Sequence, residues 1–203
     1  ENKEYKTFMD FFTRKLSLEK WFEINQNDGK YLMALPCECN VESIGFFNNP
    51  KNILRLKKPV KNVIEDLKIL GLYNIEELAY INLKLLKVYY HRIHSPINGK
   101  ITNIIEITND DIFFGKNNLW IVTINNSFLG DVYLLLVGEL SIQDFYFKKG
   151  IGSNVKMFEE IGNFNWGSQV IILYNKKCKL LKNKNLYIES KKKYFIGEPI
   201  FLI

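Results

Sequence analysis

The chain is organised around residues 160–174, which read EIGNFNWGSQVIILY. The last part, Val170 to Tyr174, is apolar and rich in β-branched residues, and this composition predicts a buried β-strand. A polar, glycine-bearing lead-in places Ser168 just before that strand. Gly167 has no side chain, so another group can approach the peptide bond between Gly167 and Ser168 closely. A glycine turn capped by a serine is the commoner explanation of such a pair, and the rest of the chain decides whether the pair is reactive.

The composition is typical of a globular protein. Of the 203 residues, 47% are hydrophobic and 25% are charged, which supports a sizeable core and excludes a disordered or fibrous chain. The net charge of +6 favours an anionic partner, such as a lipid surface, a nucleic acid or an acidic small molecule. Because no nucleic-acid-binding motif accompanies the lysines, we expect no nucleic-acid partner.

Cysteine usage indicates a reducing compartment. The odd count formed by Cys37, Cys39 and Cys178 argues against a disulfide framework. Cys37 and Cys39 would lie on one side of a strand, but no second Cys or His pair at ligand spacing accompanies them, so we expect no metal. No apolar run approaches the roughly 18 residues of a membrane-spanning helix, and no signal-peptide pattern is present. The chain begins at Glu1, so we expect a fragment or processed form from which an upstream membrane anchor could have been removed.

Helical patterns concentrate in the first 80 residues. Apolar spacing predicts an amphipathic helix over Tyr5 to Leu18, which could pack on the domain or lie on a membrane surface. Further helices are predicted over Val60 to Leu72 and over Ile75 to Tyr80. Between them, Tyr31 to Gly45 is predicted to be extended, with an interruption at Pro36.

Strand patterns dominate the remainder. They cover Leu83–Tyr90, Lys100–Ile107, Leu119–Ile124, Asp131–Val137, Val170–Tyr174, Lys179–Leu181, Leu186–Ile188 and Ile200–Ile203. Residues 125–130 predict a hairpin turn between two of these strands. No repeat, low-complexity linker or domain boundary interrupts the chain. We therefore expect an α+β fold: a β-rich single domain over residues 1–203, with helices mainly in the N-terminal 80 residues.

Both histidines of the chain, His91 and His94, lie in the segment YHRIHSP at residues 90–96. Histidine is the side chain best suited to move protons near neutral pH. Residues three apart on a regular strand face opposite sides, so either this segment is irregular or only one histidine faces a given site. A serine, a base and an orienting carboxylate form an activated nucleophile. Here these would be Ser168, one histidine and an acid that spacing does not identify, without the Gly-x-Ser-x-Gly elbow of hydrolases.

Five segments, in order, resemble motifs of the phosphatidylserine decarboxylase family, whose members are pyruvoyl-dependent enzymes made as self-cleaving proenzymes. The segments are FFTRKL (11–16), YHRIHSP (90–96) followed by Gly99, LVG (136–138), GNFNWGS (162–168) and YFIGE (194–198). The resemblance spans almost the whole chain. It implies the fold of that family and a lyase of phospholipid biosynthesis that converts phosphatidylserine to phosphatidylethanolamine.

The resemblance also implies a maturation chemistry. The Ser168 hydroxyl would attack the Gly167 carbonyl, and the zymogen would split into residues 1–167 (β chain) and 168–203 (α chain). Residue 168 would become a covalent pyruvoyl cofactor, which accepts electrons as carbon dioxide leaves. The family implies His94 as the base for self-cleavage and His91 as the residue that handles substrate and delivers protons.

The acid of the family motif is an aspartate, and this chain has Glu38 at that place, within Pro36-Cys37-Glu38-Cys39. The added methylene moves the carboxylate by about 1.5 Å relative to aspartate. The resemblance therefore implies Glu38 as the orienting acid. It leaves open an alternative, favoured by the changes at Glu38 and Cys39: a homologue that does not mature, a pseudoenzyme that binds a lipid or another partner.

The expected partners follow from the same resemblance and from the charge. We expect a phospholipid substrate and peripheral association with an anionic membrane surface, to which the positive charge is complementary. The sequence also allows a homodimer.

Overall fold

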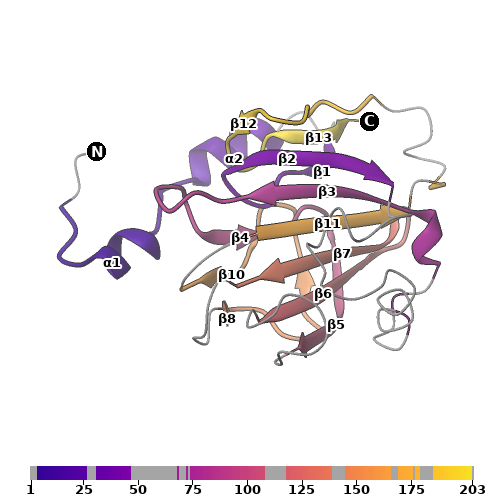
Figure 1. The fold of residues 1–203 in the computed structure, drawn as a ribbon, viewed down its shortest axis with the longest axis horizontal. Helices are drawn as coiled ribbons and strands as arrows, with labels where there is room; N and C mark the ends of the chain where they lie inside the picture. Colours follow the sequence, from indigo (N-terminus) through magenta and orange to yellow (C-terminus); the bar gives the residue numbers. More distant parts are fainter. Residues whose placement is uncertain are drawn as a thin grey trace.

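The computed structural model describes residues 4–26, 31–46, 68, 72, 74–107, 118–138, 145–165, 169–175, 177–178 and 185–202. This part of the chain is built mainly of strands, and its two α-helices lie at the N-terminal end (Figure 1). The helical elements are α1 (Phe8–Phe12), α2 (Glu19–Gln26) and the 3₁₀ helix η1 (Ile75–Glu77).

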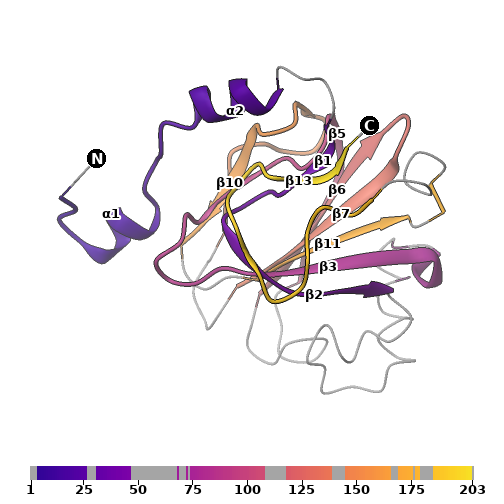
Figure 2. The same cartoon turned by 90° about the horizontal axis from the view of Figure 1, so that it is seen from above.

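The described strands form three antiparallel sheets. In chain order they are β1 (Tyr31–Ala34), β2 (Cys39–Phe46), β3 (Leu78–Lys84), β4 (Arg92–His94), β5 (Gly99–Ile107), β6 (Leu119–Asn126), β7 (Gly130–Val137), β8 (Phe145–Phe147), β9 (Asn154–Val155), β10 (Glu160–Phe164), β11 (Gln169–Asn175), β12 (Lys193–Tyr194) and β13 (Pro199–Leu202). The largest sheet has the order β12-β2-β3-β11-β7-β6-β5-β9. A second sheet has the order β4-β10-β8, and β1 pairs with β13. Figure 2 shows β1, β13 and β10 beside the large sheet, with α2 beyond them.

Strand β11 lies in the middle of the large sheet, between β3 and β7. Val170 and Ile172 face the main core, whereas Ile171 and Leu173 face a second apolar cluster on the other side of the sheet. Because both faces are buried, the strand is a continuous apolar run instead of an alternating one. The predicted strand over residues 170–174 is therefore confirmed, and it anchors the core.

The helix predicted over Tyr5 to Leu18 is only partly correct. Thr7 begins α1 with a reciprocal capping box to Asp10, and the helix ends at Phe12. The guanidinium of Arg92 then takes the carbonyl oxygens of Thr13 and Arg14, which a continuing helix would use for its own ladder. Tertiary hydrogen bonds therefore end the helix early.

The helix predicted over Ile75 to Tyr80 is wrong beyond Glu77, because β3 begins at Leu78. The strand predicted over Leu83 to Tyr90 is correct only at Leu83 and Lys84, because β3 ends at Lys84 and residues 85–90 form no strand. A short apolar run fits a helix or a strand equally well, and pairing with β2 and β11 decides for the strand. Residues 186–188 are not a strand. The predictions over 60–72 and 179–181 lie outside the described residues, apart from Lys68 and Leu72.

The sequence analysis missed β10 and its partners β4 and β8. It treated residues 160–167 as a lead-in because Gly162 and Asn163 weaken the strand pattern. In the structure a Cβ on Gly162 would collide with the Tyr146 carbonyl oxygen and would lie 2.6 Å from the Phe145 ring. The glycine therefore marks a close approach of two backbones, which is one of the roles of glycine inside a strand.

Other predictions are confirmed. The segment predicted to be extended over Tyr31 to Gly45 forms β1 and β2, and the break falls at Leu35 to Glu38, around Pro36. The hairpin predicted around residues 125–130 joins β6 to β7. The described part of the chain holds no helix that is long and apolar enough to span a membrane.

The packing at Gly162 predicts that Gly162→Ala lowers the free energy of unfolding by about 1–3 kcal/mol, because the added methyl group overpacks the β8–β10 contact. Urea unfolding measures this difference. Gly150→Ala is the matched control, since a Cβ at Gly150 meets nothing within 4 Å. Equal midpoints for the two variants would contradict the close approach.

Candidate active site

The register between β4 and β10 brings the histidine segment beside the segment that leads to Ser168. Asn163 pairs with Arg92, and the amide of Phe164 donates to the His91 carbonyl oxygen at 3.0 Å. At the start of the next strand, Gln169 pairs with Lys84. Residues 85–91 connect β3 to β4, and residues 165–168 connect β10 to β11. Because β3 pairs with β11 and β4 pairs with β10, the two connections begin and end at neighbouring strands. Residues 166–168, which include Gly167 and Ser168, lie outside the described residues.

His91 is buried, with 1% of its surface exposed. Its ring stacks on Phe12 with 3.6 Å between the centroids and 25° between the planes. Nδ1 lies 2.8 Å from the Tyr89 carbonyl oxygen. A carbonyl can only accept, so the proton sits on Nδ1 and the lone pair on Nε2. Burial lowers the pKa of His91 to about 4, the bond to Tyr89 opposes this, and the charge of Arg14 adds to it. His91 is therefore neutral at physiological pH.

His94 is also buried, with 6% exposed, and it has the same tautomer. Nδ1 donates to the Phe158 carbonyl oxygen at 2.5 Å, and Nε2 accepts from the Tyr90 hydroxyl at 3.2 Å. Burial lowers the pKa of His94, and the bond to Phe158 opposes this. Burial raises the pKa of Tyr90, so its hydroxyl remains a donor. The sequence left open whether one histidine would be exposed, and the structure buries both.

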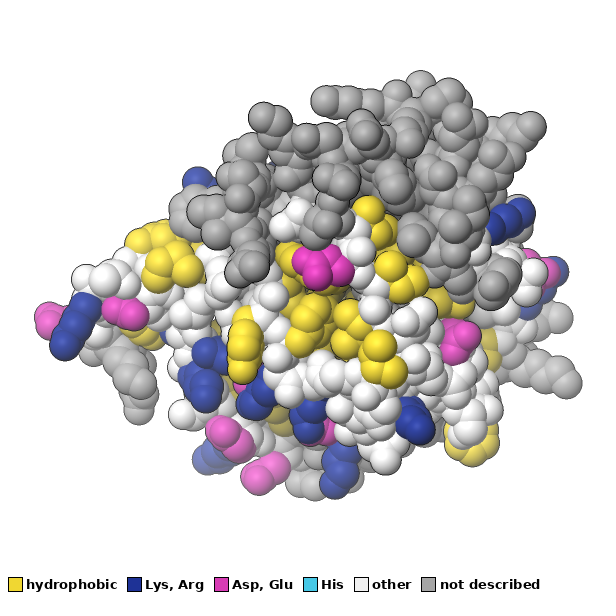
Figure 3. Space-filling model, turned by 90° about the horizontal axis from the view of Figure 1, so that it is seen from below, with side chains coloured by type: hydrophobic (Ala, Val, Ile, Leu, Met, Phe, Trp, Pro, Cys, Tyr) yellow, Lys and Arg dark blue, Asp and Glu magenta, His cyan; other side chains and the backbone are white. Residues whose placement is uncertain are grey.

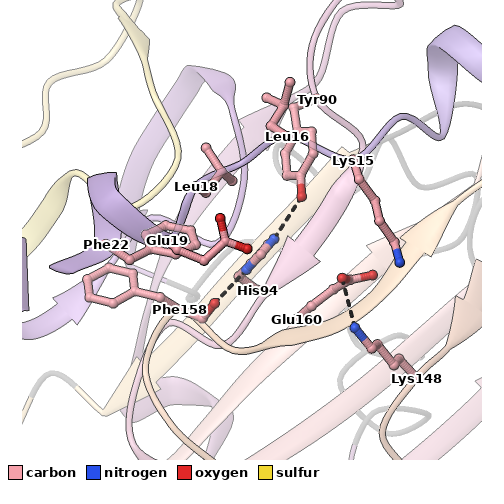
Figure 4. Close-up of a pocket in the computed structure, with 10 residues that line it drawn as sticks. All are labelled: Lys15, Leu16, Leu18, Glu19, Phe22, Tyr90, His94, Lys148, Phe158 and Glu160. Atoms are coloured by element: carbon pink, nitrogen blue, oxygen red, sulfur yellow. Dashed lines mark hydrogen bonds and ion pairs between the residues drawn. The ribbon is translucent and has the colours of Figure 1, made fainter.

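His94 lies at a pocket of about 290 Å³ beneath the segment that joins α1 to α2 (Figure 4). One side of the pocket is apolar. The other side carries Lys15, Lys148 and Glu160, with the Lys148 ammonium 3.1 Å from Glu160, whereas Glu19 lies beside Phe22 (Figure 4). The lining residues are Lys15, Leu16, Leu18, Glu19, Phe22, Tyr90, His94, Lys148, Phe158 and Glu160.

The carboxylate of Glu38 binds the backbone of the histidine segment and a lysine side chain. One oxygen accepts from the Tyr90 amide at 2.9 Å, and the other lies 3.0 Å from the Lys193 ammonium. Neither oxygen bonds an imidazole: their partners are the Tyr90 amide and Lys193, and both Nδ1 atoms bond carbonyl oxygens. The flanking Cys37 and Cys39 are buried and free, and burial raises the pKa of Cys37. Glu38 therefore does not orient either histidine by a direct hydrogen bond.

Two arginines that the sequence analysis did not single out join the N-terminal segment to the histidine segment. Arg92 forms an ion pair with Glu160 at 2.6 Å and donates to the carbonyls of Thr13 and Arg14 at 2.7 and 3.1 Å. Arg14 donates in return to the carbonyls of Val88 and Tyr89 at 3.0 and 3.1 Å. The available signal was one arginine in each of the segments FFTRKL and YHRIHSP.

Glu160 is held as an anion by these contacts. Its partial burial raises the pKa, but hydrogen bonds from Arg92 and Lys148 outweigh this and lower it below the usual value. The reciprocal arginine contacts and this carboxylate hold Phe12 against His91. The site is thus assembled from α1, the 85–91 segment, β4 and β10.

The model of the phosphatidylserine decarboxylase family matches residues 8–202, a range that contains both histidines, Glu38 and the Gly167–Ser168 pair. The chain belongs to this family. It is 28% identical over 209 residues to phosphatidylserine decarboxylase proenzyme 2 of Komagataella phaffii, covering 92% of this chain and 20% of that protein.

Two bacterial relatives are similar at comparable levels. The phosphatidylserine decarboxylase proenzyme of Fusobacterium nucleatum is 24% identical over 210 residues, covering 94% of this chain and 66% of that protein. The proenzyme of Clostridium botulinum is 26% identical over 234 residues, covering 98% and 72%. The chain thus spans 20% and 66% of the lengths of the Komagataella and Fusobacterium relatives.

The lowered pKa of His91 predicts a pH-dependent stability. Between pH 6.5 and about 4 the unfolded chain binds a proton at this residue that the folded chain does not, so stability falls as the pH falls through this window. Replacing His91 by glutamine removes that contribution, which amounts to roughly 3 kcal/mol at most. Urea unfolding at pH 7 and pH 5 should show a smaller pH effect in His91→Gln than in the wild type. Equal pH effects would mean that His91 titrates normally.

Proposed function

We propose that the protein is a phosphatidylserine decarboxylase: a proenzyme that cleaves itself between Gly167 and Ser168 and then converts phosphatidylserine to phosphatidylethanolamine. The observation that carries this proposal is the β4–β10 register, which sets the buried, neutral His91 beside Phe164, four residues before Ser168. The names of the relatives, which are decarboxylase proenzymes, support it.

We propose that residue 168 becomes a pyruvoyl group. Such a group supplies an electrophilic carbonyl that accepts the electrons released with carbon dioxide. His91 holds its proton on Nδ1, and no described residue bonds its Nε2, so that lone pair is free for proton transfer. We propose that His91 moves protons at the substrate. Of the two histidines it lies nearer the end of β10, which leads to residue 168.

We propose His94 as the base that takes the Ser168 proton during self-cleavage, as the family resemblance implies. Its neutral form, with the lone pair on Nε2, is the form that a general base requires. The Tyr90 hydroxyl occupies that lone pair in the structure. Tyr90 would have to release it before His94 acts.

The sheet supports a mature protein of two chains that stay together. A cut after residue 167 would leave β11 at the start of the smaller chain, 168–203, where it remains paired with β3 and β7. β13, near the end of that chain, remains paired with β1. Both products would therefore share one sheet and one core.

We propose that the protein binds a membrane surface, which supplies its phospholipid substrate. Phe8 on α1 and Val88 in the neighbouring turn are 46% and 63% exposed, and Arg14 bonds link the two segments. The net charge is +6, and Figure 3 shows Lys and Arg side chains, interspersed with Asp and Glu, along the edge of one face with a hydrophobic centre. These features support peripheral binding to an anionic bilayer. A homodimer remains a prediction, which native mass measurement tests.

Self-cleavage is tested by denaturing gel electrophoresis and mass spectrometry of the purified protein. We expect two polypeptides, residues 1–167 and 168–203, the smaller carrying an N-terminal pyruvoyl group. Ser168→Ala should leave one intact chain because the nucleophile is gone. Ser153→Ala is the matched control: Ser153 also follows a glycine, Gly152, and its loss should leave cleavage unchanged. An intact wild-type chain would reject the enzyme in favour of the non-maturing homologue.

The two histidines are separated by assaying cleavage and carbon dioxide release from phosphatidylserine vesicles. His94→Ala should block cleavage. His91→Ala should spare cleavage but lower carbon dioxide release by about 10²-fold or more, the usual contribution of a general acid or base. Thermal melting of each variant controls for loss of the fold. Loss of cleavage in His91→Ala alone would mean that the two roles are exchanged.

A further inference from the structure

We propose that Arg14 and Glu38 are positioning residues that fix His91 through one shared peptide group, the unit between Tyr89 and Tyr90. The importance of this arrangement for catalysis rests on the proposed function. The arrangement itself rests on three hydrogen bonds to a single peptide plane and is measurable without any activity.

Side chains of opposite charge bind the two ends of this peptide group. Its N–H, from Tyr90, donates to Glu38 Oε2 at 2.9 Å. Its C=O, from Tyr89, accepts from Arg14 Nη1 at 3.1 Å and from His91 Nδ1 at 2.8 Å. The anion therefore meets the positive end of the peptide dipole, and the cation meets the negative end.

This arrangement selects one orientation of the peptide plane. A flipped peptide would turn its carbonyl oxygen toward the Glu38 carboxylate and its N–H toward the Arg14 guanidinium. Both contacts would be repulsive. The flip would also break two hydrogen bonds to charged groups, which are stronger than hydrogen bonds between neutral groups. With the carbonyl held in place, the His91 proton is kept on Nδ1, and Nε2 keeps its lone pair.

The surroundings of Arg14 match a role in holding backbone. Its guanidinium donates to three carbonyl oxygens, those of Phe11, Val88 and Tyr89, and it lies 4.3 Å from the centre of the Phe11 ring. No carboxylate of the described residues pairs with it. The planar fork of arginine suits several fixed acceptors, whereas a lysine would offer a single point charge.

Glu38, at the other end of the peptide group, is also held by further contacts. Its second oxygen pairs with Lys193, and that ammonium lies 4.5 Å from the centre of the Tyr89 ring. The Tyr89 hydroxyl donates to Asn40 on β2 at 2.9 Å. The charged groups around His91 are thus Arg14 on its own side of the peptide, and Glu38 with Lys193 on the far side.

The test is the tautomer of His91, read from the imidazole nitrogen shifts of the ¹⁵N-histidine-labelled protein. The chain has only two histidines, so the spectra hold two imidazoles, and His94→Gln assigns them. We expect wild-type His91 to be wholly in the Nδ1–H form at pH 7. In Arg14→Gln and in Glu38→Ala the Nε2–H form should appear as a substantial fraction.

Conservative variants distinguish positioning from general destabilisation. Arg14→Lys can still bond one carbonyl, and Glu38→Gln can still accept from the Tyr90 amide, so each should recover more of the Nδ1–H form than its partner variant. These two variants also decide the question if the harsher ones fail to fold. Lys20→Gln removes the same charge from α2 and should leave His91 unchanged. Persistence of a pure Nδ1–H form in both Arg14→Gln and Glu38→Ala would overturn the proposal.

The activity measurement separates this inference from the proposed function. In mature protein, Arg14→Gln should lower kcat for carbon dioxide release by about 10²-fold, the scale of a misplaced catalytic group, with KM little changed. A wild-type chain that never cleaves would reject the proposed function, while the tautomer measurement would still decide the role of Arg14. An altered tautomer with unchanged kcat would overturn the catalytic part of the inference.

Discussion

The candidate site depends on the antiparallel pairing of β10 with β4. This pairing brings the His91 carbonyl to the Phe164 amide, and it sets the histidine segment beside the chain that leads to Ser168. On its other side β10 pairs with β8, and Gly162 allows that second pairing, because any side chain there would collide with β8. Without the β4–β10 pairing, two histidines and a serine that lie more than 70 residues apart in sequence would have no reason to meet.

The parts of the fold that could be predicted are those in which local pattern and tertiary context agree. Val170 to Tyr174 is apolar on both faces and lies in the middle of a sheet that is covered on both sides. The prediction failed where tertiary contacts decide. The spacing of Ile75 to Tyr80 suits a helix, but Leu78 to Lys84 pairs with two strands. Helix α1 ends where Arg92 binds carbonyl oxygens of residues 79 and 78 positions away.

The candidate site shows the same division. Its residue types were visible in the sequence, because histidine, serine and a carboxylate are the groups that such chemistry needs. Their connections were not. Sequence analysis assigned Glu38 to an imidazole, whereas the structure puts a peptide bond between them, and Arg14 emerged only through its contacts. Hydrogen bonds between side chain and distant backbone leave no pattern in a sequence, because every residue offers the same carbonyl.

The pairing of β1 with β13 sets an order of events for the proposed maturation. Tyr31 pairs with Leu202, so β1 cannot pair with β13 until residue 202 has been synthesised. β11 likewise meets β3 across almost 90 residues. Contacts of such long range form slowly. The proposed cut lies between β10 and β11, so it would mark molecules in which these strands have already paired with β4 and β3.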